Sequence, residues 1–199
     1  MLSGLLLAAG TSSRFGSPKP LALFKGQPVL TFLLKNLLRT KLDEIVVVLG
    51  AEAGLIRPSI IEDQRIRSVI NERYLSGRTS SFKKGLSALS ASSEGLLLLP
   101  VDTPFVQPQT IDLLIETYDK NPYPVLVPAY QGRLGHPPVF AKTLFPEFAC
   151  LGDDEPLFTV QRRHSPEVLK LPVADEGVVL SFNTLQEFET IKNKFGSRD

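Results

Sequence analysis

A chain of 199 residues is long enough for one substantial hydrophobic core, and 43% apolar with 22% charged residues is typical of a globular enzyme. Lys and Arg number 22 against 21 Asp and Glu, and a net charge of +1 excludes a general surface for nucleic acid or membrane. A single cysteine, Cys150, excludes an internal disulfide and favours a reducing, cytoplasmic location. The apolar start lacks the basic segment of a signal peptide, and no run reaches the roughly 18 apolar residues of a membrane helix.

Short apolar runs alternate along the chain with segments of helical periodicity. The expected strands are LSGLLLA from residue 2, EIVVVLG from 44, IRSVIN from 66, GLLLLPVD from 95 and PVLVPAY from 124. The expected helices are PVLTFLLKNLLRT from 28, SSFKKGLSALS from 80 and PQTIDLLIETYDK from 108. Strands that are apolar on both faces belong in a covered parallel sheet, so the pattern predicts an α/β fold with a three-layer, mostly parallel, Rossmann-like sheet.

The chain beyond residue 130 is less regular. A Gly- and Pro-bearing stretch, QGRLGHPPVFAKTLFPEF, precedes a polar segment, a strand candidate VLKLPVA and a closing helix LQEFETIKNKFG. Because no repeat or flexible linker separates this part, we expect a single domain over residues 1–199. Within it, we expect about 1–122 to form one part and about 123–199 the far side of a cleft.

The first expected strand runs directly into a loop of small and basic residues, 5-LLLAAGTSSRFGSPKPL-21. In open α/β sheets, ligands bind outside the carboxyl ends of the strands. The loop has neither the P-loop nor the dinucleotide-binding spacing, yet its small residues let backbone N–H groups approach a phosphate. Arg14 and Lys19 can neutralise that phosphate. The alternative is an ordinary turn with two solvated bases.

A second candidate feature is 96-LLLLPVDTPFV-106, in which an apolar strand ends on Asp102. A carboxylate at the carboxyl end of a strand can hold Mg²⁺ beside phosphates, because a hard cation prefers oxygen ligands. The alternative role of Asp102 is to cap the helix that follows Pro104.

Four segments together resemble one enzyme family. LAAGTSSRFGSPKPL is similar to the signature Leu-Ala-x-Gly-x-Ser-x-Arg-Met-Gly-x-x-Lys of the molybdenum cofactor guanylyl- and cytidylyltransferases, and VDTPFV stands where that family has Gly-Asp-Met-Pro. The segment 77-GRTSSFKKGL-86 resembles Gly-Met-Ser-Ser-Ser-Leu-x-x-Gly-Leu of the cytidylyltransferase branch, and 132-GRLGHPPVF-140 resembles its Gly-Arg-Arg-Gly-His-Pro-Val-Leu-Phe. Near the C-terminus, SFNTL stands where the family has Asp-x-Asp-Thr-Pro or Asn-x-Asn-Thr-Pro.

The resemblance implies a fold of the nucleotide-diphospho-sugar transferase type and transfer of CMP from CTP to molybdopterin, with Mg²⁺ as cofactor and pyrophosphate as the leaving group. A rival within the same class uses GTP or a sugar phosphate. A rival from another class is a non-catalytic chaperone that binds the cofactor and hands it to a molybdenum hydroxylase. No nucleic acid or membrane partner is implied.

The resemblance implies that about 1–122 form the nucleotide-binding part and about 123–199 the acceptor-side part. It also assigns roles to individual residues. Arg14 and Lys19 would stabilise charge on the reacting phosphates, and Asp102 and Asn183 would bind the metal. His136, with Gly135 and Pro137, would contact the acceptor. Nucleotide binding would fall to Ala8, Ala9, Gly10, Thr11, Ser12, Ser13, Gly77, Ser80 and Ser81. Three structural alternatives stay open: Ser80 as a helix cap, Asn183 or Thr184 as the cap of the last helix, and His136 as a turn donor.

Overall fold

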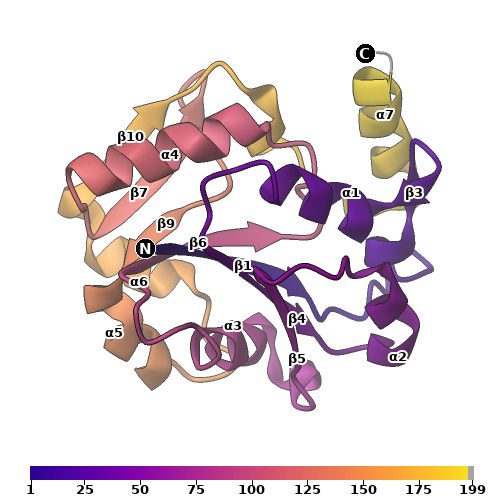
Figure 1. Ribbon diagram of the computed structural model, residues 1–199, viewed down its shortest axis with the longest axis horizontal. Coiled ribbons are helices and arrows are strands. Elements are labelled where there is room, and N and C mark those ends of the chain that lie inside the picture. The colour runs from indigo at the N-terminus through magenta and orange to yellow at the C-terminus, as the bar shows by residue number, and fades with distance from the viewer. Residues whose placement is uncertain (197–199) are drawn as a thin grey trace.

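The computed structural model describes residues 1–196, which form one central sheet with helices on both faces (Figure 1). The strands are β1 (Leu2–Ala8), β2 (Leu23–Phe24), β3 (Gln27–Pro28), β4 (Glu44–Leu49), β5 (Ile66–Ile70), β6 (Gly95–Pro100), β7 (Val125–Tyr130), β8 (Arg133–Leu134), β9 (Val139–Ala141) and β10 (Val168–Pro172). The α-helices are α1 (Val29–Leu37), α2 (Ala53–Ile56), α3 (Arg78–Leu86), α4 (Pro108–Lys120), α5 (Phe145–Cys150), α6 (Phe158–Arg163) and α7 (Leu185–Gly196).

The central sheet is mostly parallel. Its strand order is β10-β7-β9-β6-β1-β4-β5, with β8 paired to β7 outside this path. Strand β1 lies at the centre of the parallel block, where Leu7 is opposite Val48 of β4 and Pro100 of β6. Strand β9 is antiparallel to both of its neighbours, β6 and β7, whereas β10 is parallel to β7. The strands expected from the sequence are therefore confirmed, and the short strands β8 and β9 are additions to this sheet.

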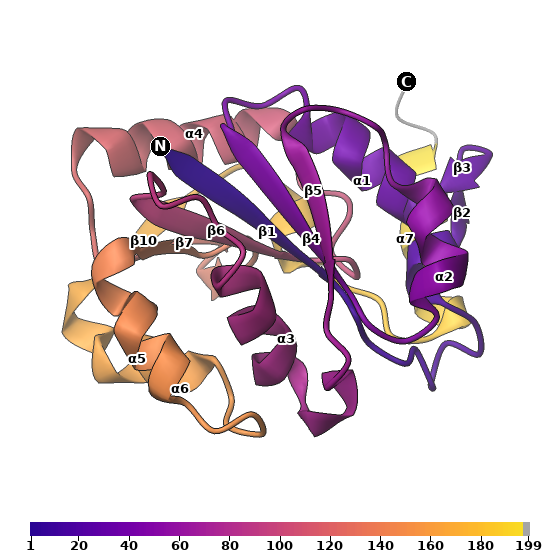
Figure 2. The ribbon, with the colours of Figure 1, turned by 60° about the horizontal axis from the view of Figure 1, so that its bottom comes forward.

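Side chains alternate from β1 into two separate cores. Leu2 and Leu6 lie in the core that also contains residues of α1, α4 and α7, whereas Leu5 and Leu7 lie in the core that contains residues of α3, α5 and α6. Figure 2 shows α1 and α4 over one face of the sheet and α3, α5 and α6 over the other. Burial of each such aliphatic side chain contributes about 1.5–3 kcal/mol. The expected three-layer α/β arrangement is confirmed.

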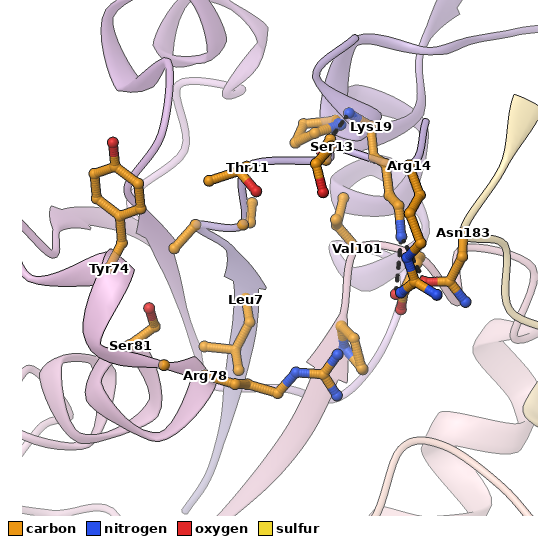
Figure 3. Close-up of a pocket in the computed structure, with 18 of the residues that line it drawn as sticks. Leu7, Thr11, Ser13, Arg14, Lys19, Tyr74, Arg78, Ser81, Val101 and Asn183 are labelled. Carbon is orange, nitrogen blue, oxygen red and sulfur yellow. Dashed lines mark hydrogen bonds and ion pairs between the residues drawn. The ribbon is translucent and has the colours of Figure 1, made fainter. Parts of the chain in front are cut away.

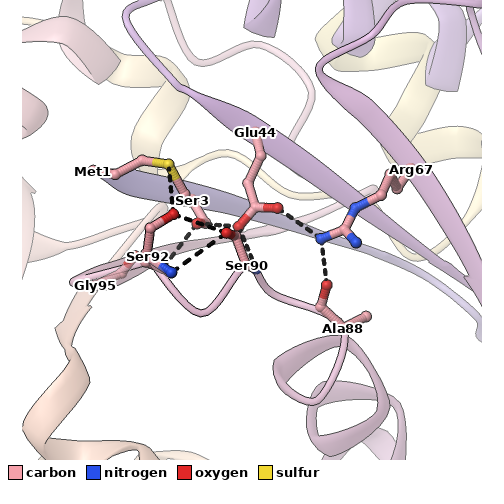
Figure 4. Close-up of polar contacts among 9 residues, drawn as sticks. Met1, Ser3, Glu44, Arg67, Ala88, Ser90, Ser92 and Gly95 are labelled. Atoms are coloured by element: carbon pink, nitrogen blue, oxygen red, sulfur yellow. Dashed lines mark hydrogen bonds and ion pairs between the residues drawn. The ribbon is translucent and has the colours of Figure 1, made fainter.

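Polar side chains fill the space at the amino ends of β1, β4 and β6 (Figure 4). The buried hydroxyl of Ser3 donates to Glu44 Oε1 at 2.6 Å and lies 2.8 Å from Ser93 Oγ, which donates to the carbonyl of Gly95. Arg67 NH2 donates to Glu44 Oε2 at 2.8 Å. These groups form hydrogen bonds with one another, so the polar side chains at the amino ends of the strands find their partners within the protein.

The helices expected around residues 28, 80, 108 and 185 are confirmed as α1, α3, α4 and α7. The sequence did not predict α2, α5 or α6, which have only four to six residues each. Among the described residues, no helix is both long and apolar enough to cross a membrane.

Candidate functional site

A cavity of about 360 Å³ opens at the carboxyl ends of β1 and β6. Most of the predicted nucleotide, catalytic and metal residues line it, even though they come from four separate parts of the chain. They are Ala8, Ala9, Gly10, Thr11, Ser12, Ser13, Arg14, Lys19, Gly77, Ser81, Asp102 and Asn183. We call this space the polar cavity.

The loop after β1 folds back on itself, which brings Lys19 into the polar cavity. Ser12 adopts a positive φ of 54°, and its carbonyl accepts hydrogen bonds from the backbone N–H groups of Phe15 and Gly16. The Ser12 hydroxyl accepts a further hydrogen bond from Lys19 N at 3.0 Å. Phe15 is buried against Phe182, with ring centroids 5.4 Å apart, and this contact ties the loop to the C-terminal segment.

Four polar side chains meet at one end of the polar cavity. Lys19 Nζ lies 3.4 Å from Asp102 Oδ2 and 3.0 Å from Asn183 Oδ1, and it donates to the carbonyl of Phe182 at 2.8 Å. Arg14 NH2 donates to the same Asn183 oxygen at 3.1 Å. Figure 3 shows Arg14, Lys19 and Asn183 on one side of the cavity and Tyr74 and Ser81 on the opposite side. These four side chains thus occupy one end, and an aromatic ring and a hydroxyl the other.

Asp102 is not a helix cap. Helix α4 begins at Pro108, and the carboxylate at its start belongs to the buried Asp175, which accepts from Gln107 N at 2.8 Å and from the Thr110 hydroxyl at 2.9 Å. Asp102 instead directs its carboxylate at Lys19, and its backbone carbonyl accepts from Phe182 N at 3.1 Å. The strand end therefore presents a carboxylate to the cavity.

Thr184 and Glu187 cap helix α7 and leave the side chain of Asn183 available to the cavity. The Thr184 hydroxyl accepts from Glu187 N at 3.2 Å, while Glu187 Oε2 accepts from the backbone N–H groups of Asn183 at 2.6 Å and Thr184 at 3.2 Å. These backbone N–H groups hold the pKa of Glu187 below its ordinary value. This reciprocal arrangement is a capping box, and it fixes the backbone that carries Asn183.

Gly77 and Ser81 line the polar cavity, whereas Ser80 does not. The Ser80 hydroxyl is buried, donates toward the carbonyls of Gly77 and Arg73, and accepts from Asn71 Nδ2 at 2.9 Å. Asn71 Nδ2 also donates to Ser81 Oγ at 3.0 Å. Ser80 thus holds the turn before α3 in place, but it is not the helix cap that its sequence position suggested, because Gly77 is the cap residue and no side chain caps this helix.

The end of the polar cavity offers oxygen donors that suit a hard divalent cation. Asp102 supplies a carboxylate and Asn183 an amide oxygen, and both contact the same ammonium group of Lys19. No group of three or more His, Cys, Asp or Glu within residues 1–196 could hold a metal without help. Magnesium commonly takes one or two protein oxygens and completes its shell with phosphate and water, so this donor set fits it only together with a phosphorylated ligand.

A second cavity, of about 500 Å³, adjoins the first, and we call it the apolar cavity. Gly135 and His136 line it, while Pro137 is buried without lining it. Its apolar lining consists of Leu7, Leu98, Pro100, Val127, Leu134, Pro138, Phe140, Pro156, Leu157 and Phe158, and its polar lining of Arg78, Thr79, Asp154, Glu155 and Gln161.

Among the polar residues that line the apolar cavity, His136 is the one predicted from the sequence. Its backbone N–H donates to the carbonyl of Val178 at 2.7 Å, and its ring Nδ1 is buried with no hydrogen-bond partner in the described part of the chain. Burial lowers the pKa of His136 below its ordinary value; the charge of Asp102 opposes this shift and that of Arg78 adds to it. The imidazole is therefore neutral near pH 7 and retains an unused nitrogen.

The lining residues of the polar cavity that escaped sequence reasoning include Tyr74, Leu75 and Arg78. They lie immediately before or at the start of α3, next to the predicted segment 77–86, whose resemblance rested on other positions. Arg78 is exposed and also lines the apolar cavity. The sequence signal that could have identified Arg78 is a basic residue at the start of a helix that follows a strand.

The chain is similar to curated proteins of two different descriptions. It is 30% identical over 136 residues to a probable molybdenum cofactor guanylyltransferase of Bacillus cereus strain Q1, and that alignment covers 66% of this chain and 63% of the relative. The chain therefore spans less than two thirds of the length of this relative. It is 29% identical over 196 residues to nicotine blue oxidoreductase of Paenarthrobacter nicotinovorans, with 94% of each chain covered.

Solved structures share the fold over almost the whole chain. Rv0371c from Mycobacterium tuberculosis H37Rv is 27% identical, with a TM-score of 0.85 over 96% of this chain and 97% of that one, and a manganese complex of the same protein has a TM-score of 0.77 at 26% identity. The 4-diphosphocytidyl-2C-methyl-D-erythritol synthase of Anaerococcus prevotii, at 19% identity, has a TM-score of 0.78 over 99% of this chain and 96% of that one. The expected nucleotidyltransferase type of fold is confirmed.

The family itself follows from a model that matches most of the sequence. The model describes the MobA-like NTP transferase domain and matches residues 4–168, which include the loop after β1, Asp102 and His136. Asn183 lies beyond the matched residues. The chain therefore belongs to the family of MobA-like NTP transferases.

Proposed function

We propose that the protein is a Mg²⁺-dependent nucleotidyltransferase that transfers CMP from CTP to the terminal phosphate of molybdopterin. One observation carries the proposal: Arg14, Lys19, Asp102 and Asn183 meet at one end of a cavity whose wall is the small-residue loop after β1. Two cations and two oxygen donors are the groups that a triphosphate with its metal requires.

The transfer needs no protein nucleophile. An oxygen of the acceptor phosphate attacks the α-phosphorus of the triphosphate, a new P–O bond forms, and the bond from the α-phosphorus to the bridging oxygen breaks. Pyrophosphate leaves with the electron pair of that bond. The acceptor phosphate is already ionised near neutral pH, so the protein contributes positioning and charge neutralisation. We assign the neutralisation of the leaving pyrophosphate to Arg14 and Lys19.

Asp102 and Asn183 are the proposed metal ligands. A divalent cation there would offset the repulsion between the donor and acceptor phosphates. Lys19 now contacts both oxygens, and in the ternary complex its ammonium would move to the phosphates. The manganese complex of Rv0371c supports a divalent cation in this fold.

The preference for CTP rests on the contour of the loop after β1. Ala8 and Ala9 are buried, and the carbonyl of Ala9 accepts from Ala51 N at 3.1 Å, which fixes the loop against the neighbouring strand end. The cytidylyl form of the signature has Ala-Ala at this place, whereas the guanylyl form usually has Ala-Gly-Gly. GTP is the second candidate, because the Bacillus cereus relative is described as a guanylyltransferase.

We further propose that the reaction takes place in the cytoplasm and that the product passes to a molybdenum hydroxylase. The single cysteine, Cys150, is exposed and free, which agrees with a reducing compartment. A sugar phosphate is a weaker candidate acceptor, since most of the residues that line the apolar cavity offer no hydrogen bonds for hydroxyl groups.

The test is pyrophosphate release with Mg²⁺ and molybdenum-loaded molybdopterin, with CTP, GTP, ATP and UTP compared in parallel. Release with CTP alone is the expected result. Release with GTP instead of CTP would identify the protein as a guanylyltransferase. Silence with all four nucleotides, together with tight binding of molybdopterin, would replace the enzyme by a cofactor-binding chaperone.

A further inference from the structure

Three residues separate the polar cavity from the apolar cavity and line both of them: Leu7, Arg78 and Pro100. Leu7 and Pro100 are neighbours across β1 and β6, so the carboxyl ends of these two strands form the apolar part of the partition. Arg78 is the first residue of α3, and Figure 3 shows its side chain extending from α3 toward the side of the cavity that carries Arg14 and Lys19. The partition therefore carries one cation.

The guanidinium of Arg78 differs from two neighbouring cations, Arg73 and Lys83, in having no partner among the residues that the structure describes. Arg73 NH2 lies 2.6 Å from Asp153 Oδ2, and Lys83 Nζ lies 3.1 Å from Asp153 Oδ1, so both charges are paired. The side chain of Arg78 forms no hydrogen bond or ion pair with any of residues 1–196. Five N–H donors in a planar fork are thus available to a ligand, and this geometry matches phosphate.

The two sides of the partition differ in what they can hold. The polar cavity has its own cations, Arg14 and Lys19, at the end far from Tyr74. The apolar cavity has Arg78 as its only Lys or Arg among the described lining residues, while Phe140, Leu157 and Phe158 contribute much of its apolar wall. A flat ring suits such a wall, and a phosphate attached to that ring has Arg78 as its nearest available cation.

We propose that Arg78 binds the phosphate of the acceptor at the partition, with the ring of the acceptor seated in the apolar cavity. This inference rests on the proposed function, because only in a nucleotidyl transfer does an acceptor phosphate lie next to the triphosphate. Arg78 then holds the attacking phosphate at the partition, where it meets the α-phosphorus. The family segment that resembles residues 77–86 has Met at this position. Arg78 is therefore a feature of this chain and not of that segment.

The experiment compares 6-hydroxymethylpterin phosphate with the same pterin after removal of its phosphate by alkaline phosphatase. Binding is followed by pterin fluorescence in the presence of Mg²⁺ and a non-hydrolysable CTP analogue. We expect wild-type protein to bind the phosphorylated form at least about 10-fold more tightly, since charge-assisted bidentate bonds are strong. Arg78→Met should abolish this preference, and Arg78→Lys should restore part of it.

The matched control is Arg73→Met, which removes a neighbouring positive charge that lies outside both cavities. This variant should keep the preference, and all variants should bind the CTP analogue with unchanged affinity. A preference that survives in Arg78→Met, or one that is lost equally in Arg73→Met, overturns the proposal. So does a wild type without preference, or an Arg78→Met variant that loses affinity for the CTP analogue instead.

Turnover with CTP and molybdopterin separates this inference from the proposed function. If the wild type releases no pyrophosphate but the preference depends on Arg78, the nucleotidyl transfer is wrong and the phosphate site stands. If turnover is normal and Arg78→Met leaves the KM for molybdopterin unchanged, the transfer stands and the role of Arg78 is wrong.

Discussion

The polar and apolar cavities share a partition but are built in different ways. The polar cavity is lined by the loop after β1, by the end of β6 and by Asn183, and charged side chains gather at one end of it. The apolar cavity is lined by aliphatic and aromatic side chains from β6, β7, β9 and the segment 154–161, with His136 and Arg78 near its polar edge. Charge neutralisation needs a few fixed residue types, whereas an apolar wall can be built from many. This difference explains why motifs identify the first cavity and leave the second almost unmarked.

Asp102→Asn should separate the cavities most sharply, because it removes the carboxylate of the polar cavity and leaves the lining of the apolar cavity unchanged. We expect kcat to fall by roughly 10²–10³-fold, the scale seen when one electrostatic contact to the reacting group is lost. Pyrophosphate release measures the effect, and circular dichroism verifies the fold. The exposed Asp119→Asn on α4 is the matched control and should keep full activity. Turnover of Asp102→Asn near the wild-type rate would contradict the assignment.

Gly77→Ala should disturb both cavities at once, because Gly77 sets the start of α3 at their common wall. Its φ of 125° is strained for any residue with a Cβ atom, and a Cβ would lie 2.5 Å from the carbonyl oxygen of Asp153. We expect a loss of about 1–3 kcal/mol in the free energy of unfolding, measured by urea denaturation. Gly54→Ala, where a Cβ meets no atom within 4 Å, provides the comparison. Equal stability of the two variants would show that the contact with Asp153 is not a constraint.

His136→Gln should affect the apolar cavity alone. The buried ring nitrogen without a partner is available to the acceptor, and loss of one hydrogen bond of about 1–1.5 kcal/mol corresponds to roughly a 5–10-fold rise in the KM for molybdopterin. The KM for CTP and kcat should stay near their wild-type values. A larger effect on CTP than on the acceptor would place His136 with the nucleotide instead.

Acidification should reveal a weak electrostatic link between the cavities. Burial lowers the pKa of His136 in the folded protein, so between that pKa and the ordinary value of 6.5 the unfolded chain binds more protons. The free energy of unfolding should therefore fall as the pH drops below about 6.5, and His136→Gln should flatten this dependence. Since the charge of Asp102 raises the pKa of His136, Asp102→Asn should lower that pKa further, which NMR titration of the ring can measure. An unchanged pKa in Asp102→Asn would show that the cavities are electrostatically independent.

Sequence reasoning recovered the parts of the fold that leave a local pattern. Strands β1, β4 and β6 are apolar on both faces, and α1 and α4 carry a clear helical period. Strand β9 has three residues, too few for any period, and its antiparallel pairing with β6 and β7 is a long-range property. The capping box of Thr184 and Glu187 was readable from the spacing Thr-x-x-Glu and would have decided between Asn183 and Thr184.

The individual residues of the site were predicted from the sequence, but the contacts between them were not. The small-residue loop and Asp102 stand at the ends of strands, where the topology of an open sheet makes them neighbours. The contact of Arg14 and Lys19 with Asn183 joins residues more than 160 positions apart, and the partition by Arg78 depends on where α3 begins. Neither follows from spacing along the chain, because both result from the packing of separate elements.

The capping box at the start of α7 affects the order in which the residues of the proposed site reach their positions. Strands β1 to β10 can complete the sheet without Asn183, whose backbone is fixed only when Glu187 in the first turn of α7 accepts its N–H. During synthesis on the ribosome, a chain that already contains the whole sheet therefore still lacks one of its two cation-facing oxygens. Under the proposed function, the pair of metal ligands is therefore complete only once the last helix has formed.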